Sequence, residues 1–124
     1  MMRRIRRNVP GSRRRWVIRM RGDLYRLRTD RRLQGHEQRG PRYCVELQGP
    51  FNLSTVVVAP TSTSAGPAIF RPEIKLADGT STLVLVDHIR SVDRELRLGD
   101  FAGRLEPREL DEVDRACRLM LGLL

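Results

Sequence analysis

Thr55-Val56-Val57-Val58-Ala59 is a short, continuous apolar run, and it decides the fold expected for this chain. A run of this length that is rich in β-branched residues is typical of a strand buried on both faces of a sheet. We therefore predict that residues 55–59 form the central strand of the protein. Hydroxyl side chains follow the run directly, in Pro60-Thr61-Ser62-Thr63-Ser64.

Further strands are expected on both sides of this run. Before it, residues 24–28 alternate apolar and polar side chains, and residues 43–48 form a second strand that ends at the turn signal Gly49-Pro50-Phe51-Asn52. After it, strand character recurs in four stretches: residues 70–76, 82–86, 89–92 and 101–105.

The carboxy-terminal residues change to a helical period. Pro107 and the acidic residues around it suit the amino terminus of a helix. One apolar stripe recurs at spacings of three and four: Leu110, Val113, Ala116, Cys117, Met120, Leu121 and Leu124. The pattern as a whole predicts a mainly β protein with a carboxy-terminal helix, built as a small, strongly bent antiparallel sheet or open barrel that the helix caps.

Composition indicates one domain. A chain of 124 residues with 40% apolar and 31% charged residues fits a globular protein, and no apolar run approaches the roughly 20 residues that span a membrane. The two cysteines, Cys44 and Cys117, lie far apart without a metal-binding spacing. We expect both to be buried apolar side chains in a reducing cytoplasm, not a disulfide or a metal pair.

The net charge of +9 is concentrated at the amino terminus. Residues 1–19 hold eight arginines and no acid, which leaves 16 basic and 15 acidic residues, a net charge of +1, in the rest of the chain. Within that rest, residues 20–42 carry a net +4 and residues 43–124 a net −3. The sequence thus predicts a nearly neutral domain, residues 20–124, with one basic edge.

The segment 1–19 is expected to be disordered, because it is strongly self-repelling and shows no periodicity. It could be a basic arm that contacts nucleic-acid phosphates. An export signal is a second interpretation, but Arg19, Arg21 and Asp23 stand where its apolar stretch should be. The preferred interpretation is an extension upstream of a true start at Met20.

A candidate phosphate site lies where the long polar loop 29–41 meets the second strand. The run 35–43, Gly-His-Glu-Gln-Arg-Gly-Pro-Arg-Tyr, offers the Glu37 carboxylate and the Arg42 guanidinium five residues apart. An antiparallel hairpin of residues 43–48 with 54–60 would set Arg42 opposite about residue 60. That geometry would place Arg42 beside Thr61 and Ser62.

Four motifs, in this order and spacing, resemble those of the MazF/PemK-like toxins, and the resemblance covers residues 20–124. They are Met20-Arg21-Gly22-Asp23, Gly35-x-Glu37-Gln38-x-Gly40-x-Arg42, Val57-Val58-Ala59-Pro60 and Val86-Asp87-x-Ile89-Arg90-x-Val92-Asp93. The resemblance implies an SH3-like or CcdB-like small β-barrel capped by an α-helix, and a homodimer. It also implies the toxin of a type II toxin–antitoxin system, whose cognate antitoxin carries an acidic tail.

The activity implied by the resemblance is that of a cytoplasmic endoribonuclease. Such enzymes cut single-stranded RNA at short sequences without a metal or cofactor, leaving 2′,3′-cyclic phosphate and 5′-hydroxyl ends. Arg42 matches the family's catalytic arginine, Ser62 stands at its catalytic threonine or serine, and Glu37 matches its loop glutamate. Candidate RNA-binding residues surround these three: His36, Gln38, Arg39, Tyr43, Thr61 and Thr63.

Three residues depart from the family pattern. Tyr43 replaces a proline and could stack on a base, and His36 replaces a serine in the loop. His88 replaces a glutamine and is expected to be structural.

Two other functions stay open at this point. A non-catalytic CcdB-like toxin would act on DNA gyrase by protein contact, and a basic RNA- or DNA-binding protein would depend on residues 1–19. The sequence does not specify the RNA sequence that would be cut.

Overall fold

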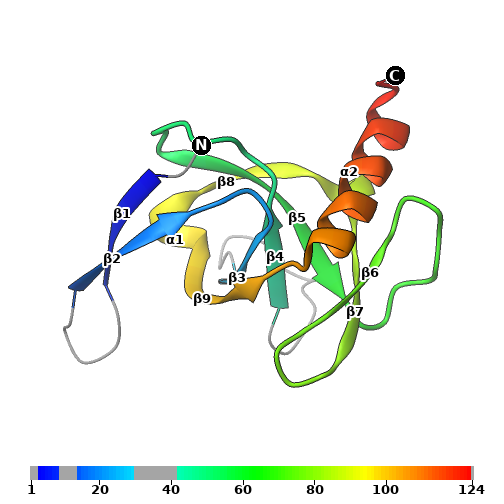
Figure 1. The fold of residues 1–124 in the computed structure, drawn as a ribbon, viewed down its shortest axis with the longest axis horizontal. Helices are drawn as coiled ribbons and strands as arrows, with labels where there is room; N and C mark the ends of the chain where they lie inside the picture. The colour runs from blue at the N-terminus through cyan, green and yellow to red at the C-terminus, as the bar shows by residue number, and fades with distance from the viewer. Residues whose placement is uncertain (1–2, 9–13, 30–41, 124) are drawn as a thin grey trace.

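The fold is a strongly curled antiparallel sheet with one long helix at its carboxy-terminal end. We describe it from a computed structural model that covers residues 3–8, 14–29 and 42–123, with side chains for residues 20–29 and 42–123. In this part of the chain seven strands form one sheet in the order β6-β7-β5-β4-β3-β9, with β8 also paired to β5 (Figure 1). The predicted fold class, mainly β with a carboxy-terminal helix, is confirmed.

The elements follow one another along the chain as short strands with two helical turns between them. The amino-terminal strands are β1 (Arg3–Asn8) and β2 (Arg14–Arg19). The sheet is built from β3 (Asp23–Leu27), β4 (Arg42–Glu46), β5 (Thr55–Ser62), β6 (Glu73–Lys75), β7 (Ser81–Val84), β8 (Arg90–Asp93) and β9 (Leu98–Arg104). The helices are the 3₁₀ turn η1 (Val86–His88), the single turn α1 (Arg94–Arg97) and the long helix α2 (Pro107–Leu121).

The strand β5 is central, as predicted from its apolar run. One of its edges pairs with β4, and the other pairs first with β8 and then with β7. Val56 and Val58 are fully buried in one apolar cluster, and Ala59 is fully buried in a second cluster on the opposite face. Both faces of β5 are therefore covered, and the strand continues past the predicted end to Ser62.

The register between β4 and β5 differs from the predicted one by two residues. Cys44 pairs with Pro60 and Glu46 with Val58, so the hairpin is centred on Asn52 instead of Phe51. The connection between the strands is a wide loop without a tight-turn sequence, so the turn residues did not fix its centre. A shift of two residues keeps every side chain on its expected face, whereas a shift of one would have reversed them.

Helix α2 packs most of its expected apolar stripe against the sheet, but Leu121 is exposed, contrary to the prediction, and Leu124 lies outside the described residues. Val113, Ala116 and Cys117 are buried beside core residues of several strands. The helix starts with a reciprocal capping box between Glu106 and Glu109, and it ends at Gly122, whose φ of +69° suits glycine.

All seven predicted strands differ from the observed ones by one to three residues at one or both ends, and two helical turns were not predicted. The strand expected over residues 70–76 is reduced to Glu73–Lys75, since Pro72 has no N–H to donate to a ladder. The last strand begins earlier than predicted, at Leu98. The turn α1 is capped by the Asp93 carboxylate, which accepts from the Leu96 amide at 2.9 Å. This helix cap was not predicted, because Asp93 directly follows a stretch that reads as a strand.

The amino-terminal residues form a hairpin where disorder was expected. β1 and β2 pair from Arg3 with Arg19 to Asn8 with Arg14, as a separate two-stranded sheet. Trp16, Val17 and Ile18 are residue types that favour extended backbone, in agreement with their place in β2.

Both cysteines are free and buried, as expected. Burial, with a smaller contribution from the nearby Glu46 carboxylate, raises the pKa of the Cys44 thiol to about 12. Burial also raises the pKa of Cys117. The two thiols are therefore protonated at neutral pH and act as apolar side chains.

The turn Met20–Asp23 makes hydrogen bonds to several strands of the sheet. The buried Asp23 carboxylate accepts from the Met20 amide at 2.9 Å and from Arg104 Nε at 2.7 Å. Gly22, at a φ of +94°, donates its N–H to Glu46 at 2.8 Å and accepts from the Leu105 amide at 3.0 Å. This turn therefore connects β3, β4 and the end of β9.

We predict that Asp23→Asn lowers the free energy of unfolding by about 1–3 kcal/mol, because the amide cannot accept from both donors and leaves one unpaired. Urea unfolding followed by circular dichroism measures the change. Asp111→Asn, on the exposed face of α2, is the matched control and should stay within about 0.5 kcal/mol of the wild type. A loss no larger for Asp23→Asn than for the control would show that the turn contributes little.

We also predict that Cys44 resists alkylation by iodoacetamide at pH 8 in the folded protein, since a thiol with a pKa of about 12 holds almost no thiolate there. Peptide mass spectrometry after timed labelling measures the rate, with the urea-unfolded protein as reference. Labelling of Cys44 in the folded protein at the unfolded rate would contradict its burial.

Candidate functional site

Two of the predicted site residues, Arg42 and Ser62, lie at the ends of neighbouring strands. β4 begins at Arg42 and β5 ends at Ser62, and continuing the register that pairs Cys44 with Pro60 sets these two residues opposite each other. Opposed residues in antiparallel strands project from the same face of the sheet. Arg42 also pairs with Leu27 at the end of β3. The paired residues of β4 and β5 end at Cys44 and Pro60, and the same register extended by two residues would give Ser62 the position opposite Arg42 that the sequence assigned to residue 60.

Arg42 combines a permanent charge with partial burial. Its side chain is half-buried, and its Nε atom is shielded from solvent without a hydrogen-bond partner among the described residues. A guanidinium remains charged at any physiological pH, and leaving a buried donor without a partner costs free energy. An anion at this strand end, such as a phosphate, would satisfy that donor.

The Ser62 hydroxyl is held in one orientation by the backbone that follows it. Its Oγ accepts from the amides of Ser64 at 3.2 Å and Ala65 at 3.1 Å, and only 6% of the residue is exposed. Ser64 Oγ lies 3.3 Å away. Because the two amides occupy the acceptor positions of the oxygen, the Ser62 hydroxyl donates its one proton to Ser64 Oγ, and a phosphate oxygen that binds Ser62 takes the place of Ser64 Oγ as the acceptor. Ser62 is therefore arranged to donate a hydrogen bond rather than to remove a proton.

Thr61 and Thr63 flank Ser62 but differ in their surroundings. Thr61 is 3% exposed, and its hydroxyl donates to the Tyr43 carbonyl at 3.2 Å, which ties β5 to β4. Thr63 is exposed at the start of the loop after β5. Tyr43 itself is half-buried and follows Arg42 on β4, so the two side chains project from opposite faces.

Four of the predicted site residues lie outside the described part of the chain. These are His36, Glu37, Gln38 and Arg39. The strand ends that carry Arg42 and Ser62 are described, and the predicted loop that would bring Glu37 to them is not.

A third segment, around Asp87, contacts the loop after Ser62. Arg71 binds the Asp87 carboxylate with two nitrogens, Nε to Oδ1 at 3.1 Å and Nη2 to Oδ2 at 2.8 Å. This hydrogen bond holds the pKa of Asp87 below its ordinary value. His88 Nε2 lies 3.4 Å from the same carboxylate on an exposed side chain, in a position consistent with the structural role expected for it.

Sequence reasoning did not single out Arg71. Its partner is 16 residues away and on another element, so no spacing along the chain points to it. The one signal in the sequence was that Arg71 precedes Pro72, which indicates that Arg71 belongs to a loop and not to the strand predicted over residues 70–76.

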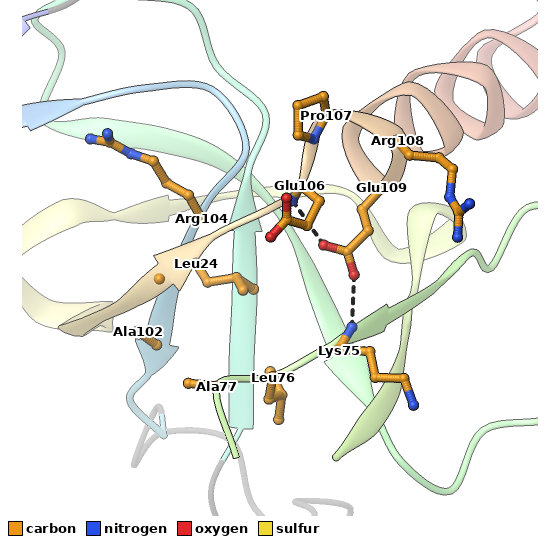
Figure 2. Close-up of a pocket in the computed structure, with 11 residues that line it drawn as sticks. Leu24, Lys75, Leu76, Ala77, Ala102, Arg104, Glu106, Pro107, Arg108 and Glu109 are labelled. Carbon is orange, nitrogen blue, oxygen red and sulfur yellow. Dashed lines mark hydrogen bonds between the residues drawn. The ribbon is translucent and has the colours of Figure 1, made fainter. Parts of the chain in front are cut away.

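A cleft of about 750 Å³ lies elsewhere, between the end of β9, the start of α2 and the β6–β7 hairpin (Figure 2). Leu24, Leu76 and Ala102 give it apolar walls, and Arg104 and Arg108 lie among its charged residues. The Glu109 carboxylate is already used there: it accepts from the Lys75 and Glu106 amides, both at 2.8 Å. Neither Arg42 nor Ser62 lines this cleft, so its size does not make it the reactive site.

The described residues give no metal centre and no membrane span. Nowhere in this part of the chain do three His, Cys, Asp or Glu side chains gather closely enough to hold a metal ion. No helix of the described residues is long and apolar enough to cross a lipid bilayer.

Comparison with known proteins identifies the family. The family model described as PemK-like, MazF-like toxin of type II toxin-antitoxin system matches residues 20–121. Rv3098A of Mycobacterium tuberculosis, which carries a provisional toxin name, is 43% identical over 105 residues, covering 84% of this chain and 98% of that protein.

Solved structures share the fold. MazF from Deinococcus radiodurans is 28% identical, with a TM-score of 0.67 over 82% of this chain and 94% of that one. A mycobacterial endoribonuclease, solved in complex with its cognate antitoxin, is 19% identical, with a TM-score of 0.69 over 86% of this chain and 97% of that one. On the family match, the 43% identity and this shared fold, the chain belongs to the PemK-like and MazF-like toxins of type II toxin–antitoxin systems.

Proposed function

We propose that this toxin is an endoribonuclease that cuts single-stranded RNA at a short sequence by transesterification, without a metal ion. The observation that carries the proposal is the antiparallel register of β4 and β5, which pairs Cys44 with Pro60 and, extended by two residues, would set Arg42 opposite Ser62. A guanidinium whose Nε has no hydrogen-bond partner among the described residues, and a hydroxyl oriented by two backbone amides, would form two halves of a phosphate site. The net charge of +4 over residues 20–42 would also attract a polyanion.

In the proposed reaction the RNA supplies its own nucleophile. The 2′-oxygen attacks the neighbouring phosphorus, and the bond from phosphorus to the 5′-oxygen breaks, giving a 2′,3′-cyclic phosphate and a 5′-hydroxyl. The proton leaves the 2′-oxygen, and the departing 5′-oxygen gains one. Neither step needs an oxidant or a reductant.

The residues would divide the chemistry between charge, orientation and proton transfer. Arg42 would stabilise the charge that builds on the phosphoryl oxygens in the transition state. Ser62 would donate to one of these oxygens and fix the phosphate. Glu37 would assist the 2′-hydroxyl as a base. His36, Gln38, Arg39, Tyr43, Thr61 and Thr63 remain the proposed RNA contacts, with Thr61 acting chiefly through its bond to the Tyr43 carbonyl.

We further propose that the toxin works as a homodimer in the cytoplasm and is neutralised by an antitoxin with an acidic tail. The structural relative solved in complex with its cognate antitoxin supports the existence of an antitoxin partner. The two free, buried thiols are compatible with a reducing compartment.

The test uses the full chain and a mixed-sequence single-stranded RNA in EDTA. We expect discrete fragments with 5′-hydroxyl and 2′,3′-cyclic phosphate ends, and a rate about 100- to 1000-fold lower for Arg42→Ala. Arg115→Ala, which removes the same charge from the exposed face of α2, is the matched control and should cut like the wild type.

Two outcomes would contradict this proposal. RNA left intact by the wild type would favour a toxin that acts by protein contact. Equal cleavage by Arg42→Ala would remove Arg42 from the chemistry.

A further inference from the structure

The loop between β5 and β6, residues 63–72, is attached to the rest of the molecule near both of its ends. Its first attachment is to Ser62 itself, whose Oγ accepts from the amides of Ser64 at 3.2 Å and Ala65 at 3.1 Å. The orientation of the Ser62 hydroxyl is therefore set by where this loop lies.

The second attachment is the Arg71 side chain, which uses all three of its guanidinium nitrogens. Two bind the Asp87 carboxylate, at 3.1 and 2.8 Å, and Nη1 donates to the Gly66 carbonyl at 3.0 Å. Gly66 directly follows Ala65, one of the two residues whose amides bind Ser62. Arg71 thus fixes the backbone one residue away from the amides that orient the hydroxyl.

Asp87 is held relative to the same strand that carries Ser62. The Leu85 amide donates to the Pro60 carbonyl at 2.8 Å, and the His88 amide donates to Leu85 at 2.9 Å, which starts the turn η1. The contacts form a closed ring. In this ring Ser62 binds the loop amides, the loop carbonyl of Gly66 binds Arg71, and Arg71 binds Asp87 in η1. The Leu85 amide, just before η1, then binds the Pro60 carbonyl of β5, two residues before Ser62, and we call this set of contacts the positioning ring.

We propose, on the basis of the function proposed above, that Arg71 and Asp87 are positioning residues that set the orientation of the Ser62 hydroxyl. They act through the loop amides and touch neither the RNA nor the reacting phosphate. Releasing them lets residues 64–66 move, so that the hydroxyl loses its fixed direction. The rate of the chemical step is therefore reduced more than the affinity for RNA, because a small misplacement of a catalytic group slows reaction more than it weakens binding.

The chemistry of the pair explains why both residues are needed. Both side chains are about one-fifth exposed, and the hydrogen bond from Arg71 lowers the pKa of Asp87, which keeps the carboxylate ionised at neutral pH. Lysine would retain the charge at residue 71 but is a single point of contact, which cannot bind two carboxylate oxygens and the Gly66 carbonyl together. Arg71→Lys should therefore keep the charge attraction to Asp87 but lose part of the hydrogen bonding that holds the loop.

The kinetic experiment compares full-length Asp87→Asn and Arg71→Lys with the wild type on a short RNA that contains the mapped cleavage sequence. We expect kcat to fall about 10- to 100-fold for Asp87→Asn and less for Arg71→Lys, with KM within about twofold of the wild type. Arg108→Lys, an exposed arginine at the start of α2, should leave both constants unchanged.

The same substitutions made in a Ser62→Ala variant distinguish an effect through the Ser62 hydroxyl from a loss of activity that does not involve Ser62. If Arg71 and Asp87 act through Ser62, they cause little further loss once the hydroxyl is gone. An equal fold-loss in both backgrounds, or an unchanged kcat for Asp87→Asn, would overturn the proposal.

A second measurement does not depend on activity. Amide hydrogen exchange at Ser64 and Ala65 should become at least about tenfold faster in Asp87→Asn than in the wild type, while amides of β5 keep their protection. If the wild type fails to cut RNA but this loss of protection is seen, the proposed ribonuclease function fails and the positioning ring stands. Unchanged exchange at both amides would overturn the ring, whatever the activity.

Discussion

The antiparallel register between β4 and β5 is the constraint on which the rest of the molecule depends. It sets Val45 against Ala59 in the core under α2, and by continuation it sets Arg42 against Ser62 at the strand ends. Since side chains alternate along a strand, a slip of one residue would mismatch the side chains that pack on the two covered faces of the sheet and would put Arg42 and Ser62 on opposite faces. Core and site therefore share one requirement, and a substitution that shifts the pairing would damage both.

The candidate site lies at the ends of β4 and β5. Up to Val58 one edge of β5 pairs with β8, and from Thr61 that edge pairs with β7. The apolar residues of β5 pack in the core. The last two residues of β5, Thr61 and Ser62, bear hydroxyl groups and lie where the pairing of this edge changes from β8 to β7. Side chains supported in this way are held more precisely than side chains on a free loop. The turn Met20–Asp23 serves the other end of the sheet, where the buried Asp23 carboxylate joins β3 to β9.

The strands and helix could be predicted from local pattern, because hydrophobic period and capping are read along the chain. Thr55–Ser62 and the stripe of α2 are examples. The register could not be read to the residue, since the wide loop around Asn52 carries no tight-turn signal. Arg42 and Ser62 were proposed because the expected hairpin and the family motifs indicated them. Arg71 was not, since its partner becomes a neighbour only in the folded chain, and the amino-terminal hairpin was missed because net charge was weighed above strand preference.

A double-mutant cycle on the pair opposed by this register tests the account most directly. Single-turnover cleavage rates would be measured for the wild type, Arg42→Ala, Ser62→Ala and the double variant on one RNA, at saturating protein. If the two side chains hold the same phosphate, the account predicts that the double variant loses much less than the product of the two single losses. Losses that multiply would show that Arg42 and Ser62 act independently, which would contradict the shared site.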